Sequence, residues 1–194
     1  MKLIDRYLIM IFTIMALTGC GANQAKINLH SKSWVQDIFQ EMPDGGKPPR
    51  GYADLVIKAS LKTHLKGYFL LEPRGSRHGE PFNTFMINID GQAKTYEVKG
   101  KEERGPQFDD QGKESPEVGL GMQYAFEQKL RLKAGNHRLF FGIPGEEYSK
   151  EINLTLEEGE TYLLHFKPNY RCYRSGRAAF ELGVCGYTAF LNKI

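Results

Sequence analysis

From residue 55 onward, apolar side chains recur at every second position, and this alternation limits what the chain can fold into. A run with this period has one apolar face as a strand, whereas a helix would scatter the same side chains around its surface. Gly, Pro and Asp-Gly turn signals separate the runs, which cover residues 55–61, 85–89, 122–132, 137–143, 152–156 and 162–166. We therefore expect an all-β fold, an antiparallel β-sandwich over residues 51–194, with the last four runs joined as a meander.

Two connecting segments of this domain carry their own signals. Asp90-Gly91 lies between alternating runs and predicts a two-residue hairpin turn, because such turns need positive φ angles. Residues 99–119 are charged and glycine-rich with little apolar content, so we expect a mobile surface loop with a possible binding role. Residues 187–191 are expected to form the last strand.

The segment before the sandwich has a helical period instead. Ser33 to Gln36 has the form of a capping box, and Trp34, Val35, Ile38, Phe39 and Met42 follow at helical spacing. This pattern predicts a short amphipathic helix over residues 33–42, docked on the domain or resting on a membrane. Residues 21–32 are small and polar and are expected to be a tether.

The first twenty residues predict export. Lys2 and Arg6 precede an apolar run, Tyr7 to Leu17, that is too short to cross a bilayer, so residues 1–19 are expected to be a signal peptide. Leu17-Thr18-Gly19-Cys20 resembles the lipobox of bacterial lipoproteins; the alternative is an ordinary signal with a coincidental cysteine. The resemblance implies that the chain is cleaved before Cys20 and that Cys20 is acylated with diacylglycerol and a further fatty acid such as palmitate. It also implies anchoring in the outer membrane, facing the periplasm or the outside, because Gly21 is not aspartate.

A second resemblance concerns the domain itself. The stretch from Leu130 to Leu139 and the segment Glu158-Gly159-Glu160-Thr161-Tyr162 resemble the PEGA-like β-sandwich modules of bacterial envelope lipoproteins. This resemblance covers roughly residues 85–167. It implies a fold and brings no active site, and the insert at 99–119 and the cysteine-bearing tail depart from the pattern.

The composition bears on which partners the protein can bind and on whether its cysteines are oxidised. The chain has 26 Lys+Arg and 23 Asp+Glu; without Lys2, Arg6 and Asp5 the balance is 24 to 22, which argues against a nucleic-acid partner. With Cys20 acylated, Cys172 and Cys185 remain, and in an oxidising envelope they are expected to form a disulfide. A metal-binding pair is the alternative for these two cysteines.

The sequence offers little further chemistry. The five histidines, at positions 30, 64, 78, 137 and 165, are scattered, so we expect no metal site, no cofactor and no catalytic residues. The tail is a candidate binding site for an anionic polymer, a lipid headgroup or a carboxylate, unless its arginines are merely solvated; the residues are Tyr170, Arg171, Tyr173, Arg174 and Arg177.

The expected role is a membrane-anchored, non-enzymatic module for an envelope protein, glycan or assembly partner. The alternatives are an envelope hydrolase and a structural subunit of a surface or secretion assembly.

Overall fold

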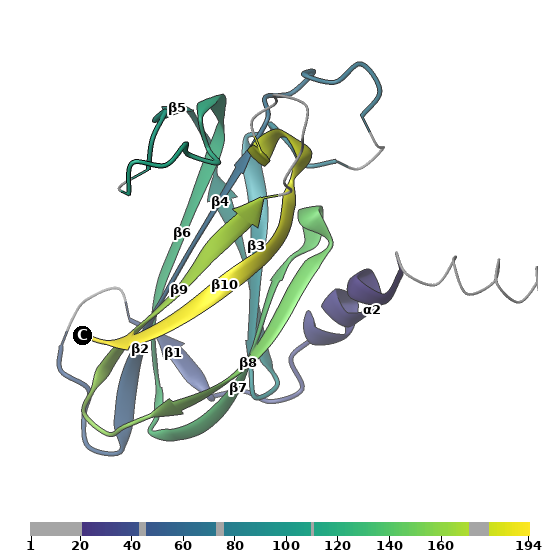
Figure 1. The fold of residues 1–194 in the computed structure, drawn as a ribbon. Coiled ribbons are helices and arrows are strands. Elements are labelled where there is room, and N and C mark those ends of the chain that lie inside the picture. Colours follow the sequence, from purple (N-terminus) through teal and green to yellow (C-terminus); the bar gives the residue numbers. More distant parts are fainter. Residues whose placement is uncertain (1–20, 43–45, 73–75, 110, 171–178) are drawn as a thin grey trace, which may run out of the picture.

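The structure, a computed structural model, describes residues 21–42, 46–72, 76–109, 111–170 and 179–194. Two sheets face each other and enclose one hydrophobic core, so the predicted all-β sandwich is confirmed (Figure 1). No helix within the described residues is long and apolar enough to span a membrane.

The first sheet has six strands in the order β1-β6-β2-β9-β10, with β5 also pairing with β6. Their bounds are β1 Phe39–Glu41, β2 Tyr52–Thr63, β5 Lys101–Gly105, β6 Gly119–Lys133, β9 Thr161–Tyr170 and β10 Val184–Lys193. Strands β2 and β9 run parallel, with Leu55 opposite Tyr162, while every other pair in this sheet is antiparallel.

The second sheet has the order β4-β3-β7-β8 and is antiparallel throughout. Its strands are β3 Phe82–Ile89, β4 Gln92–Lys99, β7 Gly135–Ile143 and β8 Tyr148–Leu156. Between β3 and β4, Ile89 pairs with Gln92, and Asp90 and Gly91 form the turn with φ angles of 49° and 97°. The predicted two-residue hairpin is confirmed.

The predicted four-strand meander is wrong. Of its strands, β7 pairs with β8, but β6 and β9 lie in the other sheet, where both pair with β2. The chain changes sheet between β6 and β7 and again between β8 and β9. This arrangement places the apolar faces of both sheets against each other, and alternation within each strand does not distinguish it from a meander.

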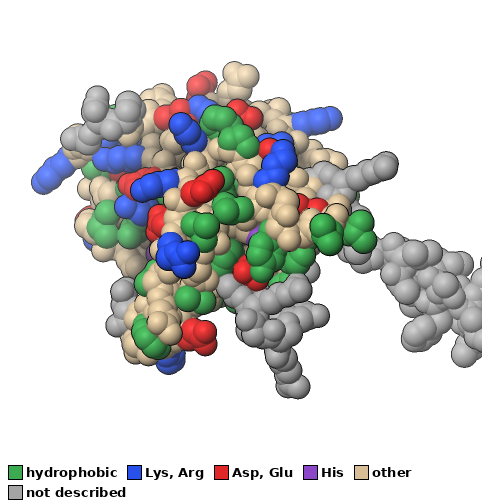
Figure 2. Space-filling model, turned by 90° about the horizontal axis from the view of Figure 1, so that it is seen from above, with side chains coloured by type: hydrophobic (Ala, Val, Ile, Leu, Met, Phe, Trp, Pro, Cys, Tyr) green, Lys and Arg blue, Asp and Glu red, His purple; other side chains and the backbone are tan. Residues whose placement is uncertain are grey.

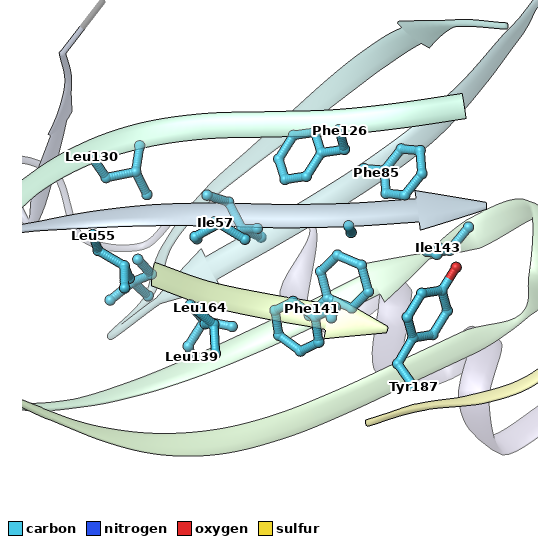
Figure 3. Close-up of a cluster of buried hydrophobic side chains, with 14 of the residues drawn as sticks. Leu55, Ile57, Phe85, Phe126, Leu130, Leu139, Phe141, Ile143, Leu164 and Tyr187 are labelled. Carbon is cyan, nitrogen blue, oxygen red and sulfur yellow. The ribbon is translucent and has the colours of Figure 1, made fainter. Parts of the chain in front are cut away.

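Aromatic side chains from the two sheets stack in the centre of the core (Figure 3). Phe141 of β7 stacks on Phe166 of β9 with ring centroids 4.1 Å apart, and Phe85 of β3 stacks on Phe126 of β6 at 5.3 Å. These contacts cross between the sheets and hold them together.

The helix predicted over residues 33–42 is wrong, and a different N-terminal segment is helical. Helix α2 spans Gly21–His30, where a tether is predicted, and Ile27 packs with Met86 and Phe140 on the outer face of the second sheet (Figure 1). Residues 33–42 are not helical: Asp37 has a φ of 62°, and Phe39–Glu41 form β1. Phe39 is buried there opposite Leu132, and the N–H groups of Ile38 and Phe39 bind the side-chain oxygen of Gln92. Burial in the sheet therefore overrides the local helical pattern.

Residues 99–119 are also more ordered than predicted. Strand β5 pairs with β6 from Lys101 opposite Gln123 to Gly105 opposite Gly119. Beyond it, the Asp109 carboxylate accepts hydrogen bonds from the N–H groups of Gln111 and Lys113, which closes a turn. The first part of this predicted loop is therefore a strand, whose polar side chains face solvent and so give no apolar signal.

Candidate metal centre

Two histidines and a glutamate meet in the connection between β2 and β3, at the end of the sandwich that is uppermost in Figure 1. His64 directly follows β2, Glu72 lies on the outgoing part of the connection, and His78 lies on the returning part. Their ligating atoms all lie within 4.8 Å of one another. The sequence analysis placed no metal site at these residues.

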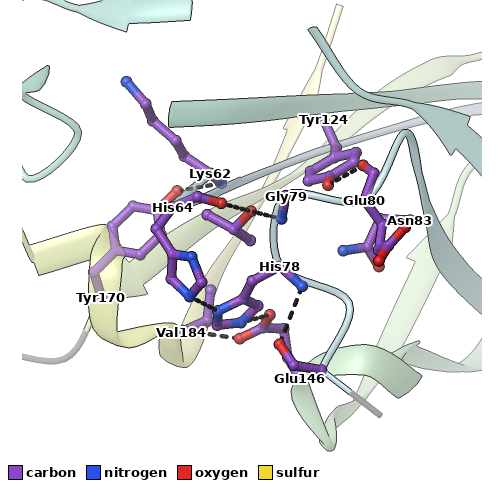
Figure 4. A network of polar contacts seen from close by, with 12 residues as sticks. Lys62, His64, His78, Gly79, Glu80, Asn83, Tyr124, Glu146, Tyr170 and Val184 are labelled. Atoms are coloured by element: carbon purple, nitrogen blue, oxygen red, sulfur yellow. Dashed lines mark hydrogen bonds and ion pairs between the residues drawn. The ribbon is translucent and has the colours of Figure 1, made fainter. Parts of the chain in front are cut away.

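The base of this connection is fixed by backbone contacts. The Gly79 N–H donates to the Thr63 hydroxyl at 3.0 Å, next to His64 (Figure 4). Gly79 has a φ of 69°, and a Cβ there would stand 2.0 Å from the Lys66 nitrogen. Only glycine allows the two arms to approach this closely, so the sequence holds His64 and His78 side by side.

Hydrogen bonds at the outer nitrogens set the tautomers of both imidazoles. The Nδ1 of His64 lies 2.9 Å from the Leu65 carbonyl oxygen, which can only accept, so this nitrogen carries the hydrogen. The Nε2 of His78 lies 2.7 Å from the Glu146 carboxylate and donates to it. In the neutral rings, the lone pairs of His64 Nε2 and His78 Nδ1 therefore face each other across 3.0 Å (Figure 4).

A carboxylate oxygen joins these two nitrogens. Glu72 Oε1 lies 3.3 Å from His64 Nε2, and it accepts a hydrogen bond from the Ser76 hydroxyl at 2.6 Å. Three electron-rich atoms in such proximity repel one another unless a proton or a metal cation lies between them. A tetrahedral zinc ion with bonds of about 2.0–2.1 Å would separate its ligand atoms by roughly 3.3 Å. The separations of 3.0 Å between the two imidazole nitrogens and 3.3 Å between His64 and Glu72 are close to that value, and all three atoms lie within 4.8 Å of one another.

Glu146 supports the cluster through the outer nitrogen of His78. It ends the short 3₁₀ helix η1, Pro144–Glu146, and its second oxygen accepts the Val184 N–H at 3.1 Å. Gly183 has a φ of 82°, and a Cβ there would stand 2.9 Å from that oxygen. A carboxylate that accepts the outer N–H of a ligating histidine is the usual second-shell arrangement at metal sites.

The cluster is largely shielded from solvent. The His64 side chain is 2% exposed and that of Glu146 is 4% exposed, whereas Glu72 and His78 are partly accessible at 21% and 16%. Figure 2 looks onto this end of the molecule: acidic and basic side chains are mixed over it, and very little histidine surface is visible. Burial from water strengthens the interaction of the cluster with a cation.

The tail residues predicted to bind an anion are not placed by the structure. Arg171, Tyr173, Arg174 and Arg177 lie outside the described residues. Tyr170 is buried at the end of β9, where its hydroxyl donates to Glu117 at 2.5 Å and accepts the Lys62 N–H at 2.9 Å. Burial raises the pKa of Tyr170 well above its ordinary value. Its placement gives no support to a ligand site, because the hydroxyl is used inside the domain.

Of the two cysteines predicted to form a disulfide, the structure describes one. Cys185 lies in a β-bulge of β10 as an exposed free thiol, with its sulfur 3.1 Å from the Asn169 carbonyl oxygen. Cys172 lies outside the described residues, and no disulfide occurs among the residues that are described. The bridge between Cys172 and Cys185 stays a prediction.

Sequence reasoning missed the cluster because its members are far apart in the chain. His64 and His78 are fourteen positions apart, and Glu146 comes from a connection between two other strands. One available signal was that His64 follows the predicted run at residues 55–61 while His78 precedes the one at residues 85–89. Comparison with known protein families and with curated proteins found no match, so no family assigns a role to these residues.

Proposed function

We propose that this protein binds one divalent transition-metal ion, with zinc as the best fit, through His64 Nε2, Glu72 Oε1 and His78 Nδ1. The observation that carries the proposal is the convergence of three electron-rich atoms, of which the two imidazole nitrogens have their lone pairs directed inward by the partners of the outer nitrogens. Two imidazoles and one carboxylate suit zinc, copper or nickel, whereas magnesium and calcium prefer all-oxygen sites.

Around this site we propose the role that the sequence suggests. The protein is an exported module, anchored through acylated Cys20 in the outer membrane, and it is non-enzymatic. The near-complete burial of His64 favours stable metal holding over hydrolysis, because a hydrolytic substrate would have to reach the ion. An envelope hydrolase and a structural subunit of a surface assembly are the competing functions.

The metal proposal is tested by isothermal titration calorimetry on the detergent-solubilised, chelator-treated full chain. We expect one equivalent of Zn²⁺ to bind, and Mg²⁺ to give no signal under the same conditions. Saturation at 100 times the Kd should stabilise the fold by about 2.7 kcal/mol and raise the Tm. Glu72→Gln removes the anionic ligand on a partly exposed residue and should weaken binding roughly 100-fold or more, because second-shell losses alone cost 10–100-fold.

The matched control is His165→Ala, which removes an exposed histidine of β9 away from the cluster and should leave the Zn²⁺ affinity unchanged. Glu146→Gln keeps the size of the second-shell side chain and should weaken binding by about 10–100-fold. If Zn²⁺, Cu²⁺ and Ni²⁺ all give no heat and no change in Tm, the cluster holds a proton instead of a metal and the proposal is wrong.

The anchor proposal has a separate test. Intact-mass spectrometry of the protein from its native envelope should show loss of residues 1–19 and an added diacylglyceryl and acyl mass on Cys20. Cys20→Ala should move the protein out of the membrane fraction, because acyl chains supply about 0.8 kcal/mol per buried methylene. An uncleaved, unmodified N-terminus would contradict the predicted anchor and leave the metal proposal untouched.

A further inference from the structure

A recess of about 260 Å³ lies between the segment after α2 and the hairpin turn of β3 and β4. It lies at the opposite end of β3 from the metal cluster and shares no residue with it. Aromatic rings and polar side chains both line it: Trp34, His30 and Phe140, together with Asn88, Asp90 and Arg138.

Trp34, the single tryptophan of the chain, is exposed and yet held in place. Its side chain is 62% exposed, although tryptophan is highly buried on average. The backbone N–H of Trp34 donates to the Gly91 carbonyl at 3.1 Å. The neighbouring Ser33 hydroxyl exchanges two hydrogen bonds with the backbone of Ala93. A Cβ at Gly91 would stand 2.2 Å from the indole Nε1, so the ring lies directly against the turn. One edge of the indole therefore lies against the turn, while most of the ring is exposed to solvent.

The remaining walls are equally fixed. His30 stacks on Phe140 with centroids 4.1 Å apart. The Asp90 carboxylate accepts a hydrogen bond from the backbone N–H of Arg138 at 2.8 Å and lies 2.6 Å from His137 Nδ1. The guanidinium of Arg138 forms an ion pair with Glu151. The recess therefore exists before any ligand arrives, which lowers the entropic cost of binding.

Hydrogen-bonding capacity is left over inside the recess. A carboxylate has about four acceptor positions, and Asp90 uses two of them within the protein. Arg138 binds Glu151 through Nε and Nη2, which leaves its third nitrogen available.

We propose that this recess binds one pyranose ring of a polysaccharide; its assignment to the cell envelope rests on the proposed anchor. A pyranose has a flat face of C–H groups that can lie on the indole, and its hydroxyls both donate and accept, as the leftover groups require. Asp90 already contacts His137, and Arg138 is already paired with Glu151, so both charges have partners within the protein, which favours a neutral polyhydroxylated ligand over an anion or a cation. The size suits a single sugar ring, because larger ligands occupy pockets of about 300–1,000 Å³.

Tryptophan fluorescence tests this proposal directly, because the only indole of the chain lines the recess. The full chain in detergent, with EDTA present to remove metal, is titrated with methyl glucoside, methyl galactoside and N-acetylglucosamine. We expect at least one of these sugars to give a saturable change in emission with a Kd in the millimolar range. Glycerol at the same concentrations should give only a non-saturating solvent effect.

Variants separate a specific site from a general effect. Arg138→Ala removes an exposed wall residue and should weaken the binding of that sugar roughly ten-fold, the equivalent of one good hydrogen bond. Arg104→Ala, at an exposed arginine of β5, is the matched control and should leave the affinity unchanged. Saturation-transfer NMR on Trp34→Ala, which needs no indole, should show loss of contact with the sugar C–H protons.

Two outcomes would overturn the sugar site: no saturable change with any of the three sugars, or binding that Arg138→Ala and Trp34→Ala both leave intact. Because EDTA is present throughout, neither outcome depends on the metal proposal, and a failure of the metal experiment leaves the sugar site standing.

Discussion

Replacing Phe141 by alanine is expected to remove about 3–5 kcal/mol from the free energy of unfolding. Phe141 is fully buried, stacks on Phe166 of the opposite sheet and meets Tyr187 edge-on at 5.5 Å. The truncation leaves a cavity where the two sheets are held together, and surrounding side chains relax only partly into it. Domains of this size are stable by only about 5–15 kcal/mol, so the variant should retain a marginal fold.

Urea unfolding followed by circular dichroism measures this loss. The matched control is Phe190→Ala, in which a 47% exposed phenylalanine of β10 is truncated; its unfolding free energy should change by less than about 0.5 kcal/mol. Equal unfolding midpoints for Phe141→Ala and the unmodified protein would show that the packing between the sheets does not hold the fold together.

Replacing Asp54 by alanine is expected to cost about 3 kcal/mol or more, because it leaves two cations without their shared partner. Asp54 is fully buried in β2 and pairs in register with Arg131 of β6. The guanidinium donates to both carboxylate oxygens, at 2.7 and 3.0 Å, and the Lys129 ammonium lies 3.1 Å away. Such a bidentate, charge-assisted pair is strong, and its loss exposes the cost of desolvating the arginine.

The control uses the same two strands. Lys58 and Glu127 also pair in register between β2 and β6, at 3.0 Å, but both side chains are exposed to solvent. Glu127→Ala should therefore cost less than about 1 kcal/mol. Urea unfolding of both variants gives the comparison, and equal losses for the two would contradict the importance of burial.

The Asp54 effect should also depend on pH. Burial disfavours the charged carboxylate, but hydrogen bonds from Arg131 and Lys129 outweigh it and hold the pKa of Asp54 below its ordinary value. A lowered pKa in the folded state stabilises the protein above the unfolded-state value of about 3.9. The difference between the unmodified protein and Asp54→Ala should thus stay constant from about pH 7 to 5 and shrink as the pH falls below about 4.

The candidate metal centre illustrates what sequence patterns leave undecided. Scattered histidines gave no reason to expect a site, yet the hydrogen bond from the Gly79 N–H to Thr63 brings His78 beside His64. Glu146 joins them because β7 and β3 are neighbours in the second sheet, which no local pattern specifies. Ligand sets assembled from separate connections become visible only once the strand order is known.

In the N-terminal region, local sequence patterns predict the wrong secondary structure. Residues 33–42 have helical spacing, but Phe39 gains more by lying in the sheet opposite Leu132. Residues 21–30 have almost no apolar period, yet Ile27 finds Met86 and Phe140 on the outer face of the second sheet. A short segment of weak preference adopts the structure that its packing partners favour.

The sequence by itself determined the extended segments that have an alternating apolar face, and where one hairpin turns. Alternation along β2, β3 and β6 to β9 predicts one apolar face per strand, and Asp90-Gly91 accepts the positive φ angles of a tight turn. Tertiary structure alone decided that β2 lies between β6 and a parallel β9, that α2 covers the second sheet, and that His64 meets His78. Period and turn preference are local properties of the chain, whereas strand order depends on which apolar faces bury each other best across the whole domain.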